Sequence, residues 1–216
     1  MVEIKPAASS VALIGDVVRS RTRVDRQALH DELTRALADT NTAVEADDDL
    51  VITVGDEFQG VYGSLGRALT ASFFLRAALH PRTDVRFGIG RGSVTTLDPV
   101  RGIHDGPACW AARDAITAAE QRALKAQTRT SRTAYAGPDD APGTVGAVQA
   151  ALDCLDFMVG SMSTTSREIL GGLMRGHTQQ DLADQAGISA SAVSQRVRRD
   201  GLGVAVEAMQ RLGELP

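Results

Sequence analysis

The sequence predicts an α+β fold, in which a sheet with helices is followed by a smaller part made only of helices. Strand and helix patterns alternate along the first part of the chain, and a cluster of glycine and proline residues interrupts them at 137–143. After that cluster the pattern is helical almost to the last residue. The chain has 216 residues, of which 43% are hydrophobic and 23% charged, so it can bury a core. We therefore expect one large domain over 1–144 and a small helical domain over 145–216.

The first part of the chain shows strands and helices in the order βαββαβ, followed by a further helix. Strands are predicted at 11–16, 50–54, 58–62 and 85–90, and helices at 25–39, 65–80 and 107–126. In the first helix, Leu29, Leu33 and Leu37 recur every four residues and therefore lie on one face. The turn at 55–57 joins the second and third strands into a hairpin. This order suits an antiparallel or mixed sheet of the ferredoxin-like kind, with helices packed on one face.

Composition excludes several classes of protein. No run of the ~18 apolar residues that a membrane span needs is present, and the first residues lack a signal-peptide pattern, so we expect a cytoplasmic protein with no membrane partner. The two cysteines and four histidines do not have the spacing of a zinc site. A net charge of -4 disfavours binding of nucleic acid over the whole surface. Any contact with DNA must therefore be local.

Two carboxylates stand where strands end. Asp16 closes the first strand, and Asp56 lies in the hairpin turn. Neighbouring strands lie ~5 Å apart, so the two side chains can converge. Such a pair can hold Mg²⁺ or Mn²⁺, which complete their coordination with water and with phosphate oxygens of a ligand. Aspartates at strand ends and in turns are also common as solvated or capping residues, and spacing alone leaves both interpretations open.

Four short segments resemble the catalytic core of nucleotidyl cyclases. They occur in the same order as in those enzymes, at residues 13–16, 51–58, 86–92 and 106–113. The hairpin segment Val51-Ile52-Thr53-Val54-Gly55-Asp56-Glu57-Phe58 resembles class III nucleotidyl cyclases, and its last four residues are also similar to diguanylate cyclases. The resemblance covers about residues 11–120. It implies a nucleotidyl cyclase-like sheet with helices.

The resemblance also implies roles for single residues. Asp16 and Asp56 would hold the metal, and Arg113 would approach the phosphates of a nucleotide, in cyclases from the opposite subunit, so we expect a homodimer. Arg113 can equally be a surface residue of an alanine-rich helix. Two positions depart from the pattern: Ile52 replaces a lysine that contacts the purine, and Cys109 replaces an asparagine that orients the ribose. These departures favour sensing of a nucleotide or metal over catalytic turnover.

Residues 178–199 predict two short helices separated by a glycine. Thr178 is placed to cap the first helix together with Asp181, in a capping-box arrangement. Gly187 permits a sharp turn, and Ser189 is placed to cap the second helix. A supporting helix is expected just before, at about 166–174. The whole resembles the helix-turn-helix of sigma-factor region four and related regulators.

The second of these helices is expected to contact DNA. Val193 and Val197, four residues apart, would hold its inner face. The side chains expected to contact DNA are Ser189, Ser191, Ser194, Gln195, Arg196, Arg198 and Arg199. Hydroxyl, amide and guanidinium groups of this kind bond to base edges and phosphates. Three arginines within four positions favour DNA binding over a helical packing or dimerisation module.

The segment 15–21, the hairpin 55–60 and the helix-turn-helix together resemble the SatD family of bacterial proteins. Arg19 and Arg21 suit contacts with the phosphates of a nucleotide, although with Ser20 they can equally form a solvated turn. We therefore expect a DNA-binding transcription regulator whose cyclase-like domain dimerises and senses a nucleotide or a divalent metal. Two alternatives remain: an active metal-dependent nucleotidyl cyclase or transferase, and a noncatalytic adaptor that contacts another protein.

Overall fold

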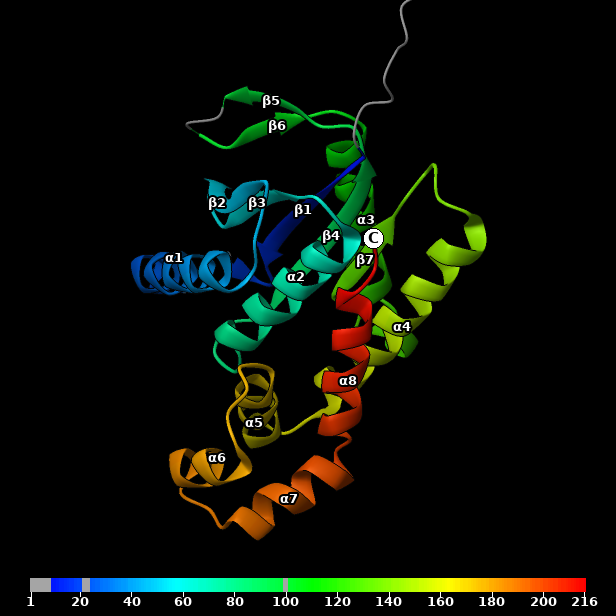
Figure 1. Cartoon of the computed structure of the whole chain (residues 1–216). Helices are drawn as coiled ribbons and strands as arrows, with labels where there is room; N and C mark the ends of the chain where they lie inside the picture. The colour runs from blue at the N-terminus through cyan, green and yellow to red at the C-terminus, as the bar shows by residue number, and fades with distance from the viewer. Residues whose placement is uncertain (1–8, 21–23, 99–100) are drawn as a thin grey trace, which may run out of the picture.

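A five-stranded mixed sheet forms the centre of the molecule in the computed structural model, which describes residues 9–20, 24–98 and 101–216 (Figure 1). The strand order is β2-β3-β1-β4-β7, in which β4 and β7 are parallel and the other neighbours antiparallel. The bounds are β1 Ser10–Val17, β2 Asp48–Val54, β3 Glu57–Tyr62, β4 Val85–Gly92 and β7 Thr133–Ala136. A separate pair consists of β5 Thr95–Asp98 and β6 Ile103–Asp105. The predicted α+β class and the βαββαβ order are confirmed.

Eight α-helices complete the described part of the chain. They are α1 Arg26–Ala43, α2 Leu65–Leu79, α3 Pro107–Ala123, α4 Pro142–Ser161, α5 Thr164–Met174, α6 Gln179–Ala186, α7 Ala190–Arg199 and α8 Leu202–Gly213. Side chains set the start of the first two, because Asp25 accepts a hydrogen bond from the Ala28 backbone and Ser64 from the Arg67 backbone. None of the described helices is long and apolar enough to span a bilayer.

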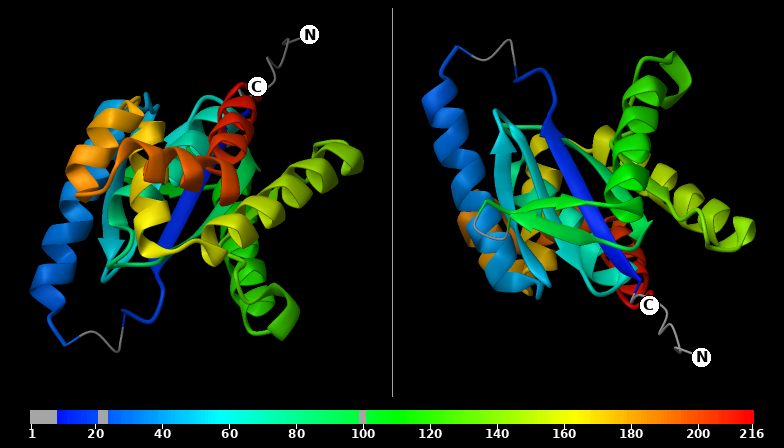
Figure 2. Two further views of the ribbon diagram at one scale, coloured as in Figure 1. Left: turned by 90° about the horizontal axis from the view of Figure 1, so that it is seen from below. Right: turned by 90° about the horizontal axis from the view of Figure 1, so that it is seen from above.

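Helices cover both faces of the sheet, so the prediction that they pack on one face is wrong. Figure 2 shows α1 and α3 on opposite sides of the strands. Alternate residues of β1 point to opposite faces. Val11 and Leu13 lie in the main core with Leu33 of α1, whereas Ala12 and Ile14 pack with alanines of α3.

Glycines in β4 explain why α3 can lie directly on the second face. A Cβ atom at Gly88 would lie 2.1 Å from the Ala112 carbonyl oxygen, and one at Gly90 would lie 2.2 Å from the Ala108 carbonyl oxygen. Any side chain at either position would push the helix away. The glycines that carried the cyclase resemblance therefore also have a packing role.

The helices after residue 141 share the main hydrophobic core of the sheet. That core continues through Leu152 of α4 and Ile169 of α5 to Met209 of α8. Helix α8 packs on α2, and the backbone N–H groups of Leu65 and Gly66 donate to carbonyl oxygens at the end of the chain. The boundary expected between 144 and 145 stays a prediction.

Helices α5, α6 and α7 have the local geometry that the sequence predicts for the helix-turn-helix. The capping box of Thr178 with Asp181 is present at the start of α6. Gly187 ends α6 in the left-handed conformation with φ 64°, and Ser189 caps α7 by accepting a hydrogen bond from the Ala192 backbone. These three helices lie at the end of the molecule far from β5 and β6 (Figure 1).

Candidate functional site

The end of β1 and the β2–β3 hairpin bring the two predicted metal ligands together. Asp16 is the last residue but one of β1, and Asp56 lies in the turn between β2 and β3. The backbone N–H of Val17 donates to Oδ2 of Asp56 at 3.2 Å. The Asp56 carboxylate therefore lies against the strand residue that follows Asp16.

The Asp16 carboxylate is only partly neutralised. Arg86, its partner across the β1–β4 ladder, donates to Oδ2 at 3.2 Å. The second oxygen, Oδ1, is buried and has no hydrogen-bond partner in the described part of the chain. Burial raises the pKa of Asp16; Arg86 opposes this shift, and the nearby carboxylates, led by Glu120, add to it. A divalent cation would supply the missing partner, so Asp16 and Asp56 fit a Mg²⁺ or Mn²⁺ ion.

These side chains surround a hollow of about 530 Å³, which we call the carboxylate hollow. Its lining residues are Asp16, Val17, Arg19, Ser20, Val54, Asp56, Glu57, Arg86 and Glu120. Among the described residues, no group of three or more His, Cys, Asp and Glu side chains could hold a metal ion by itself. A cation here would therefore depend on two aspartates together with water and ligand phosphates.

The predicted phosphate-binding arginines have different surroundings. Arg113 is bonded twice to the Glu57 carboxylate, at 2.5 and 2.8 Å, and these bonds raise the pKa of its guanidinium. It would have to leave Glu57 to reach a ligand. Arg19 lines the carboxylate hollow and has φ 58°, a left-handed conformation that is uncommon for a side chain of this size. Arg21 lies outside the described residues, so its role stays a prediction.

The predicted DNA-contacting residues divide into two groups. Ser191, Gln195 and Arg198 are exposed and follow one another at four and three residues, so they share one face of α7. Ser194 is partly buried, and Ser189 is the N-cap of the helix.

Two of the three arginines that favoured DNA binding are bonded to other side chains of the protein. Arg196 donates to the hydroxyls of Ser163 and Ser166, both at 3.3 Å, and Arg199 bonds to Asp200 at 2.8 Å. Arg198 has neither a hydrogen-bond nor an ion-pair partner for its side chain among the described residues. The geometry therefore favours Arg198, with Gln195 and Ser191, for an external contact.

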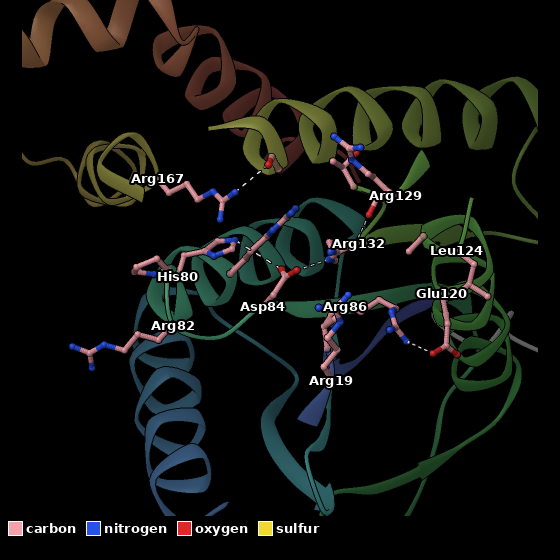
Figure 3. A pocket seen from close by; sticks show the side chains of 16 residues that line it. Arg19, His80, Arg82, Asp84, Arg86, Glu120, Leu124, Arg129, Arg132 and Arg167 are labelled. Carbon is pink, nitrogen blue, oxygen red and sulfur yellow. Dashed lines mark hydrogen bonds and ion pairs between the residues drawn. The ribbon is translucent and has the colours of Figure 1, made fainter. Parts of the chain in front are cut away.

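A second hollow, which sequence reasoning missed, lies beside the first and has a volume of about 900 Å³ (Figure 3). We call it the arginine hollow. Its lining residues are Val18, Arg19, Arg76, His80, Pro81, Arg82, Asp84, Arg86, Glu120, Ala123, Leu124, Arg129, Thr130, Arg132, Gly160 and Arg167. They come from β4, from helices α2 to α5 and from several loops, so no motif in the sequence marks them.

Comparison with known proteins gives a family and two similar structures. The model of the SatD family matches residues 10–215. One similar structure is the catalytic core of a rhodopsin-guanylyl cyclase with converted specificity in complex with ATPalphaS, with 20% identity and a TM-score of 0.44 over 52% of this chain and 73% of that one. Another is the monomeric guanylyl cyclase domain of the RhoGC fusion protein from the aquatic fungus Blastocladiella emersonii, with 19% identity and a TM-score of 0.45 over 52% and 77%. The search of curated proteins found no match. Because the family model spans nearly the whole sequence, the chain belongs to the SatD family.

Proposed function

We propose that this protein is a DNA-binding transcription regulator whose sheet domain senses a nucleotide or a divalent metal at the carboxylate hollow. The observation that carries the proposal is the exposed face of α7, which presents Ser191, Gln195 and Arg198 beyond a capped and sharply turned pair of helices. A glutamine can bond two atoms of adenine, and an arginine can bond two atoms of guanine, in the major groove. The net charge of -4 is compatible with such a local contact.

The test of DNA binding is the double variant Gln195→Ala/Arg198→Ala. Both side chains are exposed, so the fold should stay intact, whereas each lost base contact costs about 1–3 kcal/mol. Specific binding should therefore weaken by at least roughly tenfold at fixed salt. A genomic binding selection would first define the site, and fluorescence anisotropy would then measure the affinity.

Arg211→Ala is the matched control for this variant. Arg211 is an exposed arginine on α8 that pairs with Glu207, and its loss should leave DNA affinity unchanged. If the native protein enriches no sequence in the selection, the proposal loses its support.

The sensing part of the proposal rests on the unpartnered Oδ1 of Asp16 and on the adjacent Asp56. Mn²⁺, alone or with a nucleoside triphosphate, should raise the melting temperature of the native protein. The double variant Asp16→Asn/Asp56→Asn should not respond, whereas Asp139→Asn, at an exposed aspartate outside the hollow, should respond fully. An unchanged Mn²⁺ titration in the double variant would make both residues ordinary strand-end aspartates.

We also propose that the protein works as a homodimer. Large apolar side chains are exposed on three consecutive elements, β5, β6 and the start of α3. They are Leu97, Ile103 and Trp110, with 62, 40 and 60% of their surface accessible. Such side chains favour an interface with a second copy. Light scattering after gel filtration should give twice the monomer mass, and Trp110→Ala should reduce it.

The second candidate is an active metal-dependent nucleotidyl cyclase or transferase, favoured by the convergence of Asp16 and Asp56. Cyclisation also needs the ribose hydroxyl aligned with the α-phosphorus. Cys109 is buried, which raises the pKa of its thiol, and a thiol is a weak hydrogen-bond donor. We therefore expect no cyclic product from ATP or GTP with Mn²⁺ by mass spectrometry. A product that disappears in Asp56→Asn would establish the enzyme instead.

A further inference from the structure

We propose that the arginine hollow binds a small anion that carries two or more linked phosphate groups, and that it does so without a metal ion. This site adjoins the carboxylate hollow, with which it shares Arg19, Arg86 and Glu120, but the proposal does not depend on metal sensing or on DNA binding. The class of ligand includes inorganic oligophosphates and nucleoside di- and triphosphates.

The charge of the hollow is the first support. Seven arginines line it, against the two carboxylates of Asp84 and Glu120. Two more carboxylates neutralise part of this charge from outside the lining, because Asp16 pairs with Arg86 and Asp156 pairs with Arg76. Arg129 and Arg167 have no carboxylate partner among the described residues, in a chain whose net charge is negative. An anion of high charge is the matching ligand.

Buried donors without acceptors are the second support. The side chain of His80 is only 7% exposed, and neither ring nitrogen has a hydrogen-bond partner in the described part of the chain. One of the two nitrogens of a neutral imidazole carries a hydrogen and is a donor. The buried Nε atoms of Arg76 and Arg86 also lack an acceptor there. Leaving a buried polar group unpaired is costly, and phosphate oxygens would supply the acceptors.

Two arginines are placed to form ion pairs with the phosphate groups of a ligand. Arg129 is exposed, and its guanidinium has no carboxylate partner among the described residues. Among the described residues, Arg167 donates only to backbone carbonyl oxygens, those of Val159 and Gly160, both at 3.0 Å. In Figure 3 these two arginines lie on different sides of the hollow, and Arg132 lies on the same side as Arg129. A ligand with several phosphate groups could therefore contact both.

The size and lining of the hollow indicate the class of anion. A volume of about 900 Å³ is that of a site for a nucleotide-sized ligand rather than for one phosphate ion. Most of the lining residues are charged or polar, and Leu124 is among the few large apolar side chains. Recognition would therefore depend on the phosphates and much less on an apolar or aromatic group.

The position of the hollow would join two parts of the molecule. Arg76 belongs to α2, which packs on the sheet, and Arg167 belongs to α5, which contacts both α6 and α7. An anion bonded to both arginines would hold α5 against α2. Binding should therefore stabilise the arrangement of the helix-turn-helix relative to the sheet.

Calorimetric titration with inorganic triphosphate in EDTA tests the proposal, with ATP and orthophosphate as parallel ligands. Triphosphate should bind, and orthophosphate should bind at least roughly tenfold more weakly, because fewer charge-assisted hydrogen bonds form. Arg129→Gln and Arg167→Gln should each weaken triphosphate binding by roughly tenfold. Arg129→Gln removes an exposed side chain, so it should fold normally even if Arg167→Gln does not.

Arg211→Gln, at an exposed arginine on α8 outside the hollow, should bind triphosphate like the native protein. The Asp16→Asn/Asp56→Asn variant should also bind it in EDTA, which separates this site from the carboxylate hollow. If ATP binds but inorganic triphosphate does not, and both arginine variants weaken the binding of ATP, the proposal is supported and the nucleoside contributes to recognition.

Three results would overturn the proposal. They are no binding of triphosphate or ATP in EDTA, equal binding by the native protein and the Arg129→Gln variant, and equal affinity for orthophosphate and triphosphate. Loss of DNA affinity in Arg129→Gln without any binding of triphosphate would assign the arginines to DNA instead.

Discussion

The carboxylate hollow and the arginine hollow share three lining residues, Arg19, Arg86 and Glu120, yet they have opposite chemical character. In the first, acidic groups predominate and a carboxylate oxygen of Asp16 lacks a donor. In the second, guanidinium groups predominate and donors lack acceptors. Arg86 lowers the negative charge of one site and adds positive charge to the other. A recognisable sequence motif therefore marks the carboxylate hollow, which is the smaller of the two, and not the arginine hollow.

The largest effect is expected at Asp156, whose buried carboxylate lies behind the arginine hollow. It pairs with Arg76 and accepts hydrogen bonds from the backbone N–H groups of Arg132 and Thr133, at 2.6 and 2.8 Å. Asp156→Ala would leave a buried guanidinium uncompensated and should lower the free energy of unfolding by about 3–5 kcal/mol. Urea denaturation measures this change.

Asp153→Ala, on the same helix, is the control for Asp156. Asp153 is about one-third exposed and pairs with Arg122, so its loss should cost about 1 kcal/mol or less. Equal effects of the two substitutions would mean that the buried pair does not hold α4 against α2 and the start of β7.

An intermediate effect is expected at Arg86, because it borders both hollows. Its side chain is 11% exposed and bonds to Asp16 at 3.2 Å and to Glu120 at 3.1 Å. Arg86→Gln should lower the free energy of unfolding by about 2 kcal/mol, since it leaves the partly buried Asp16 carboxylate without its countercharge. It should also strengthen Mn²⁺ binding at one hollow and weaken triphosphate binding at the other. If the affinities for Mn²⁺ and for triphosphate changed in the same direction, the two hollows would not have opposite chemical character.

The smallest effect concerns the pH dependence of stability. Burial, with help from Arg76, Arg167 and Arg132, lowers the pKa of His80 to about 4, and Asp84 opposes this shift. In the unfolded chain His80 therefore binds a proton from about pH 6.5 downward, whereas in the folded protein it does so only near pH 4. Between these values the stability decreases as the pH decreases. His80 should make the protein about 1 kcal/mol less stable at pH 5.5 than at pH 7.

Thermal or urea unfolding of His80→Gln at both pH values measures this contribution. The variant should lose most of the pH dependence, whereas His30→Gln, at an exposed histidine of α1, should retain it. An unchanged pH dependence in His80→Gln would mean that His80 is readily protonated in the folded state.

The parts of the fold that sequence predicts are those with a local signal. Strands β1 to β4 and helices α1 to α3 have clear apolar patterns, and each was placed within a few residues of its observed bounds. Strand β7 has only four residues, and its place beside β4 depends on contacts with distant segments. The position of α3 on the second face depends on two glycines whose packing role becomes visible only in three dimensions.

The same distinction holds for the candidate sites. Asp16 and Asp56 stand in recognisable segments, so their convergence could be expected. Arg76, Arg132 and Arg167 come from distant segments, and only the folded chain brings them to one hollow. Arg196 was expected to contact DNA, but its bonds to the serines at the start of α5 depend on how α7 packs against α5. No pattern within α7 carries that information.

The close contact between α3 and β4 has a mechanical consequence. At Gly88 and Gly90 the backbone of β4 lies directly against α3, so we expect helix and strand to move together. Trp110 near the start of α3 is exposed to solvent. Near the other end of α3, Glu120 pairs with Arg86 of β4 at the border of the two hollows. A displacement of α3 at Trp110 would therefore also shift that ion pair.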